Sequence, residues 1–292
     1  MTRAGAEDSK ERRNRLVRDA GRHWRLTSRD AWIIESVAKL RFATTFQLAR
    51  LHFGGSRWAA NKRLRKLLDA GLVRAWVRSL AEENVYSLDR GGARLLNEPA
   101  GDQSSRAIPR GLDGNLDHLL AINQVRIALA VGLPEADGEL AWWRSDWDLR
   151  AQRRGPVVPD ALFRVRWEGA RESDFALELD NKTRAPRAFL RKILRYRAAL
   201  APPGGLYGLR DPLLLVVGRD DRWLARYQEG VAHARVGTGI WFAALGEVEN
   251  NGALAPLWRP ATGDARVSLR ELSSLLYRRE GLAPKTHVFT AG

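Results

Sequence analysis

Three carboxylates lie at the ends of two neighbouring strand-like runs in the second half of the chain. Asp160 enters the run 157–167, and Glu178 and Asp180 close the run 174–180. A short turn joins the runs, so a hairpin would bring the start of the first and the end of the second to one edge of a sheet. Carboxylate oxygens are the ligands that Mg²⁺ prefers, and a bound Mg²⁺ orients water against a phosphodiester. The pattern predicts that Asp160 and Glu178 can share one Mg²⁺; the alternative is that all three acids are ordinary turn and strand-end residues.

A second set of residues, between 54 and 78, has the chemistry of a nucleic-acid contact. This stretch contains seven Lys and Arg and one acid. Arg recognises guanine edges in the major groove, and both Lys and Arg bind phosphates. The alternative is a solvated basic surface on a domain that contacts protein. We predict contacts to double-stranded DNA from Ser56, Arg57, Asn61, Lys62, Arg63, Arg65 and Lys66 on one helix, and from Arg74 and Arg78 on the strand that follows.

The elements that position these basic residues are a helix, a short helix, a turn, the basic helix and a hairpin. This order is the pattern of a winged helix-turn-helix, and the stretch 42–88 resembles that family, including the phrase at 67–73. The basic helix would be capped by Ser56, and apolar positions such as Trp32 and Ile33 would share one face of the first helix. The expected elements are helices from 27 or 28 through Leu40, after Thr44-Thr45, and from Ser56 to about Asp69, followed by strands 72–79 and 84–88.

The elements after residue 115 predict a mixed α/β sandwich, because a helix and three strands are followed by alternating helices and strands. Residues 97–114 are rich in Gly, Pro and Ser, which is typical of a linker. The predicted fold class is therefore α/β (α+β). The expected parts are a basic flexible arm (1–25), a winged helix-turn-helix domain (26–97), a linker (98–114) and a mixed-sheet domain (115–292).

The mixed-sheet domain resembles the restriction-endonuclease-like, PD-(D/E)xK, superfamily through Pro159-Asp160 and Glu178-Leu179-Asp180. That resemblance implies a lysine two residues after the second acid, where it helps to activate water. Counted from Asp180 this residue is Lys182, whereas Lys192 would reach back from the following helix. The set Asp160, Glu178 and Asp180 with Lys182 or Lys192 is therefore either a rearranged metal-dependent site or an inactivated one.

The chain as a whole resembles the replication-relaxation family of plasmids and integrative elements, which combines a winged helix with a nuclease-like domain. The matching stretches are 117–126, 158–161, 175–180 and 190–196. The resemblance implies association with plasmid or mobile-element DNA.

The amino-acid composition excludes several classes of protein. The chain has 292 residues, 49 Lys and Arg against 34 Asp and Glu, and no cysteine, which excludes disulfide scaffolds, Cys-ligated zinc and thiol nucleophiles. Residues 1–110 carry a net charge of +11 and residues 111–292 a net charge of +4. Short apolar runs and a charged N-terminus predict a cytoplasmic protein with no membrane partner, associated with the nucleoid or a plasmid.

The sequence thus favours a double-stranded DNA-binding protein that controls replication, transfer or transcription of a mobile element. A homodimer is expected because winged helices commonly read palindromic half-sites. Two alternatives remain open. One is a Mg²⁺-dependent endonuclease or nickase, and the other is a protein-interaction scaffold.

Overall fold

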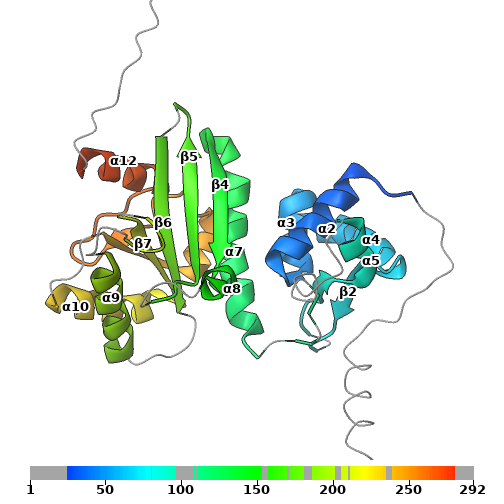
Figure 1. The fold of residues 1–292 in the computed structure, drawn as a ribbon, viewed down its shortest axis with the longest axis horizontal. Coiled ribbons are helices and arrows are strands. Elements are labelled where there is room, and N and C mark those ends of the chain that lie inside the picture. The colour runs from blue at the N-terminus through cyan, green and yellow to red at the C-terminus, as the bar shows by residue number, and fades with distance from the viewer. Residues whose placement is uncertain are drawn as a thin grey trace, which may run out of the picture. The chain divides into compact units, whose positions relative to one another are not determined.

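Tertiary contacts divide the chain into two units, Met1–Ile127 and Ala128–Gly292 (Figure 1). The computed structural model describes residues 25–79, 81–96, 108–109, 111–112, 114–152, 157–169, 171–180, 186–200, 205–209, 211–234 and 239–279. Residues 1–24 of the expected arm, and most of the expected linker, lie outside these ranges.

The first unit has the fold of a winged helix-turn-helix. Its described strands form a three-stranded sheet of order β1-β3-β2, in which β3 pairs antiparallel with both neighbours. The hairpin β2–β3 follows the third helix directly, as the sequence predicts. The elements are α2 (Ser28–Leu40), β1 (Ala43–Thr44), α3 (Thr45–His52), α4 (Arg57–Asp69), β2 (Val73–Trp76), β3 (Val85–Leu88) and α5 (Arg90–Leu95).

Local sequence signals set the ends of these helices. Thr27 and Asp30 form a capping box at the start of α2, and Thr44 and Gln47 form another at the start of α3. The hydroxyl of Ser56 accepts from the backbone N–H of Ala59 at the start of α4. These caps satisfy N–H groups that a helix cannot satisfy itself.

A buried ion pair joins α2 to α4. Asp30 is fully buried, and the Arg63 guanidinium donates to both of its carboxylate oxygens. Burial alone would raise the pKa of Asp30, but hydrogen bonds from Arg63 and Thr27 outweigh it and hold that pKa below its usual range. Arg63 therefore packs into the fold, where its charge compensates a buried acid.

The first half of α7 (Leu116–Gly132) packs within the first unit. The Asn123 amide donates to the carbonyls of Leu40 (3.0 Å) and Phe42 (2.8 Å), and Gln47 donates to the carbonyl of Leu120 (2.7 Å). These buried bonds explain why contacts divide the chain inside α7 rather than in the segment 98–114. The domain boundaries given above stay a prediction.

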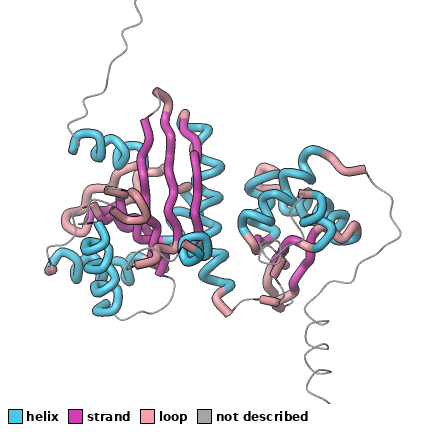
Figure 2. Tube along the Cα trace, viewed as in Figure 1, coloured by secondary structure: helices cyan, strands magenta, loops and turns pink. Residues whose placement is uncertain are grey.

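The second unit is built on a six-stranded mixed sheet of order β4-β5-β6-β7-β8-β9, which confirms the predicted fold class. The pairs β4–β5 and β5–β6 are antiparallel, β6–β7 and β7–β8 are parallel, and β9 closes the order antiparallel. Figure 2 shows the strands in magenta with helices beside them. The elements are the rest of α7, a 3₁₀ turn (Pro134–Ala136), β4 (Gly138–Ser145), α8 (Asp146–Ala151), β5 (Ala161–Trp167), β6 (Arg171–Asp180), α9 (Pro186–Leu200), β7 (Leu213–Gly218), α10 (Asp221–His233), β8 (Ile240–Ala244), α11 (Leu245–Asn251), β9 (Arg259–Pro260) and α12 (Leu269–Arg279).

Helices α9 and α10 lie side by side and cover one face of this sheet (Figure 1). Their buried side chains, such as Phe189 and Ile193, share one core cluster with Ala176 of β6 and with residues of β7 and β8. Successive side chains of a strand point to opposite faces. The residues that follow Ala176 at intervals of two, Glu178 and Asp180, therefore face the same two helices.

Replacing Asp30 by alanine should destabilise the first unit by about 3 kcal/mol, because the Arg63 charge would remain partly buried without its carboxylate. Urea denaturation followed by circular dichroism measures this. Glu35→Ala is the matched control, since it removes an exposed acid of the same helix that pairs with Lys39, and it should cost less than about 0.5 kcal/mol. Equal losses in the two variants would contradict a stabilising role for the buried pair.

Candidate functional site

Asp160 and Glu178 lie together where β5 begins and β6 ends, as the hairpin geometry predicts. Ala161 pairs with Leu177 across β5 and β6, which sets Asp160 beside the end of β6. The backbone N–H of Asp160 donates to the Leu177 carbonyl (3.0 Å), and its carboxylate accepts from the Leu179 N–H (2.7 Å). The start of β5 and the end of β6 are thus fastened to each other through Asp160.

The Glu178 carboxylate is buried and bound on both oxygens. It is 4% exposed, and it accepts hydrogen bonds from the Lys192 ammonium and the Tyr196 hydroxyl, both on α9. Burial, and next the negative charge of Asp160, raise its pKa from an ordinary 4.5 to about 7, although Lys192 and Tyr196 counteract this. Burial and the Glu178 charge likewise raise the pKa of Tyr196.

Asp180 is also buried, but a different helix holds it. The hydroxyl of Tyr227, on α10, donates to its carboxylate, and the Tyr227 ring stacks on Phe189 with centroids 4.2 Å apart. Each acid at the end of β6 therefore accepts from a tyrosine of one covering helix. Neither tyrosine was predicted from the sequence; Tyr196 follows Lys192 by four residues, the spacing that puts both on one helix face.

Of the two predicted lysines, Lys192 is brought to Glu178, and Lys182 lies outside the described residues. In the part of the chain that the structure describes, no three acidic or histidine side chains are grouped as metal ligands. Both oxygens of Glu178 are already used by Lys192 and Tyr196. As arranged, the site does not fit Mg²⁺, because the ammonium supplies the positive charge that the metal would bring.

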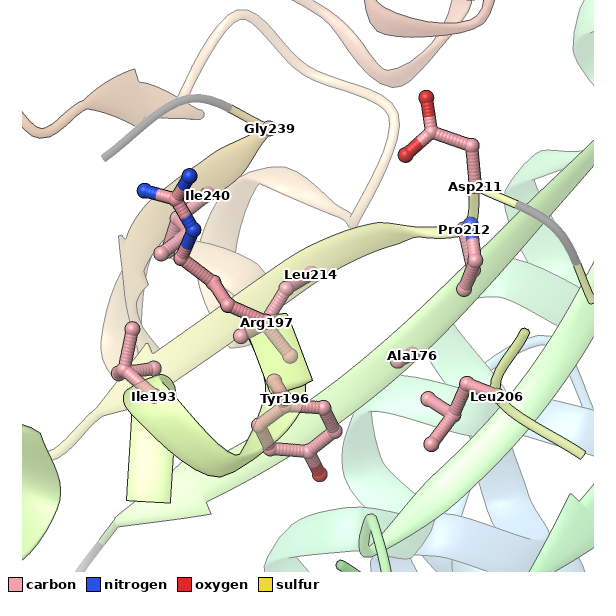
Figure 3. A pocket seen from close by; sticks show the side chains of 10 residues that line it. All are labelled: Ala176, Ile193, Tyr196, Arg197, Leu206, Asp211, Pro212, Leu214, Gly239 and Ile240. Carbon is pink, nitrogen blue, oxygen red and sulfur yellow. The ribbon is translucent and has the colours of Figure 1, made fainter. Parts of the chain in front are cut away.

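The pocket beside Tyr196 is too small for a small-molecule ligand. Apolar side chains line it between the charged groups of Arg197 and Asp211 (Figure 3). Its volume is about 40 Å³, enough for a few water molecules and far below the few hundred Å³ that small ligands occupy.

The outward face of α4 carries three of the nine predicted DNA contacts, Asn61, Lys62 and Arg65. Ala60, Leu64, Leu67 and Leu68 are buried, so the opposite side of the helix faces solvent. That side presents an exposed row at spacings of three and four residues: Trp58, Asn61, Lys62 and Arg65. Trp58 was not among the predicted contacts, although its spacing from Asn61 and Lys62 was a usable signal.

The remaining predicted contacts differ in how much of each side chain is exposed and in which acid it pairs with. Arg57 is 60% exposed and pairs with Glu83 at 3.2 Å, whereas Ser56 caps the helix. Arg74 is 15% exposed and lies 3.5 Å from Asp89, and Arg78 lies 2.8 Å from Asp117. Lys66 lies on α4 and is half-buried. With Arg63 on Asp30 and Arg65 on Asp69 (3.1 Å), five of the nine predicted contacts thus pair with acids of their own unit.

A family model described as replication-relaxation matches residues 34–205, which include α4, Asp160, Glu178 and Lys192. The chain belongs to the replication-relaxation family. No match was found among curated proteins or among solved structures. No described helix of this replication-relaxation protein has both the length and the apolar character needed to cross a bilayer.

The raised pKa of Glu178 gives the stability of this family member a defined pH dependence. Between about pH 4.5 and 7 the folded chain holds this proton more tightly than the unfolded chain, so stability falls as pH rises through that window. Relative to Glu178→Gln, the wild type should lose up to about 3 kcal/mol across the window. Urea denaturation at a series of pH values measures the difference.

The matched control is Glu172→Gln on the same strand. Hydrogen bonds from Arg166 lower the pKa of Glu172, so its contribution is lost as pH falls, the opposite sign. Parallel pH profiles for the wild type and Glu178→Gln would contradict the interpretation of the buried carboxylate.

Proposed function

We propose that the chain is a double-stranded DNA-binding protein of a plasmid or another mobile element, and that the outward face of α4 contacts the major groove. Membership of the replication-relaxation family supports a role in replication of such elements. The proposal includes a homodimer, a cytoplasmic location on the nucleoid or a plasmid, and control of replication, transfer or transcription.

The observation that carries this proposal is the exposed row Trp58, Asn61, Lys62 and Arg65 on a winged-helix recognition helix. Helix α4 has 13 residues and is therefore about 20 Å long, a length that fits a major groove. Amide and guanidinium groups are the side chains that read base edges, and ammonium groups bind phosphates.

Charge supports the same surface. Residues 1–110 carry a net charge of +11, and the cations of α4 that reach solvent include Arg57, Lys62 and Arg65. A concentration of positive charge on one unit attracts a polyanion from a distance and releases counterions on binding.

The endonuclease alternative is favoured by one observation, the grouping of Asp160, Glu178 and Lys192 at a sheet edge. It is opposed by the ammonium of Lys192 and the hydroxyl of Tyr196, which each donate a hydrogen bond to an oxygen of Glu178 where a metal ion would bind. We therefore propose that the second unit supports DNA binding without cleaving the strand. Magnesium-dependent nicking of supercoiled DNA that is lost in Asp160→Ala would reverse this choice.

Replacing Lys62 and Arg65 by alanine should weaken duplex binding at least tenfold at low salt, because each removes a phosphate or base contact. Fluorescence anisotropy with labelled duplex DNA, selected by the wild-type protein from genomic fragments, measures the dissociation constant. Lys39→Ala is the control: it removes one exposed positive charge of the same unit from α2, and it should leave the constant within about twofold.

The salt dependence of the wild type provides a second measurement. Arg57, Lys62, Arg65 and Lys66 are the four α4 cations other than Arg63; Arg57 pairs with Glu83 and Arg65 with Asp69, and we propose that phosphates replace these acids on binding. The four cations predict a slope of log K against log salt of about −3.6 for each bound winged helix. Binding that is insensitive to salt and to both substitutions would instead favour the protein-interaction scaffold.

A further inference from the structure

Trp58 is the most exposed large apolar side chain in the described part of the chain. Its exposure is 74%, and it stands on the second residue of α4, one helical turn before Asn61 and Lys62. An indole buries about 150–250 Å² when it is covered, so leaving it in water forgoes a large hydrophobic gain. Such a side chain at the start of a recognition helix indicates a partner surface that is in part apolar.

The surroundings of Trp58 hold it on the outward face. The Lys62 ammonium lies 5.1 Å from the centroid of the indole, one turn further along the same helix. This cation–π contact holds the apolar indole ring next to an ammonium group that can bind a phosphate. The inward positions of α4 are filled by Ala60 and Leu64, so the indole cannot turn into the core of its own unit.

The major groove offers one apolar group at base edges, the C5-methyl group of thymine. We propose that Trp58 packs against a thymine methyl group in the major groove and makes α4 selective for thymine at one position of each half-site. This inference rests on the proposed function, since it requires α4 to lie in the groove. Lys62 would bind the adjacent phosphate, and Asn61 the neighbouring base edge.

The charge of the surrounding row decides between duplex DNA and an apolar protein partner. Trp58 is flanked by Arg57, Lys62 and Arg65. Arg57 pairs with Glu83 and Arg65 with Asp69, but all three cations are exposed, and no acid of α4 precedes Asp69. An apolar protein surface would have to desolvate these cations, whereas phosphates on both sides of a groove compensate them. The position of the indole among cations therefore matches a methyl group set between two phosphate backbones.

The test uses the full chain and duplexes recovered by the wild-type protein from a pool of randomised duplex DNA. Each thymine of the recovered consensus is replaced in turn by deoxyuridine, which lacks only the methyl group. For the wild type, one replacement in each half-site should weaken binding about fourfold, the value for one buried methyl group. Trp58→Ala should bind more weakly than the wild type and show no loss on that replacement.

Trp32→Ala is the matched control, because Trp32 is a second exposed indole of the same unit, 59% exposed, and lies on α2. It should keep the wild-type response to deoxyuridine. Thermal denaturation should show Trp58→Ala folded, since no core contact is removed.

Two results would overturn the inference while leaving DNA binding by α4 intact. One is a wild-type protein that binds the duplexes but responds to no deoxyuridine replacement, which would mean that the indole contacts the backbone or nothing. The other is a Trp58→Ala variant that keeps the full wild-type response. Absence of any duplex binding by the wild type at low salt would overturn the proposed function itself, and this inference with it.

Discussion

The buried carboxylate of Glu178 constrains how helix α9 packs on the sheet of the second unit. A buried charge is costly unless it is compensated, and the compensation here comes from the ammonium of Lys192 and the hydroxyl of Tyr196. Both belong to α9, so neutralising the acid also fixes this helix on the sheet. Asp180 repeats the arrangement with Tyr227 of α10. The end of β6 is therefore where the polar groups of the sheet and of both covering helices meet.

In the first unit, too, a buried acid is compensated by a nearby cation. That cation is Arg63, which the sequence predicted as a DNA contact. Asp30 is buried at the start of α2, and Arg63 of α4 reaches it. A charge that compensates a buried acid is unavailable to a phosphate. The buried side chains of Ala60, Leu64, Leu67 and Leu68 set the rotation of α4 about its axis, and the ion pair fastens α4 to α2 in that orientation. With Arg63 turned inward, the positions Trp58, Asn61, Lys62 and Arg65 must face outward.

The sequence alone predicted the order of the longer helices and strands, and the meeting of Asp160 with Glu178, because apolar periodicity and hairpin geometry are local rules. It did not predict the short elements α8, α11 and β9. It failed where neighbouring positions compete for one interior face. Trp32 was expected on the apolar face of α2, but it is exposed while Ile33 and Ile34 are fully buried. Helical periodicity sets Arg63 beside the buried positions Ala60 and Leu67, and Arg65 on the other side of the helix. It does not reveal that Arg63 meets an acid there, because Asp30 lies 33 residues earlier.

Counting basic residues alone overstates how many cations of the first unit are open to an anionic partner. Arg63, Arg74 and Arg78 each face an acid of their own unit, Asp30, Asp89 and Asp117 respectively. Such pairs contribute little to the field at a distance, since opposite charges close together cancel beyond a few ångströms. On α4 itself, Arg57 and Arg65 also pair with acids, Glu83 and Asp69, but both arginines stay exposed on the outward side. The same side of α4 also bears Trp58. Under the proposed function, one helix face would therefore both attract the duplex by charge and distinguish its bases by shape. In the function proposed above, the lysines and arginines of this face attract the duplex, and the few groups between them distinguish its sequences.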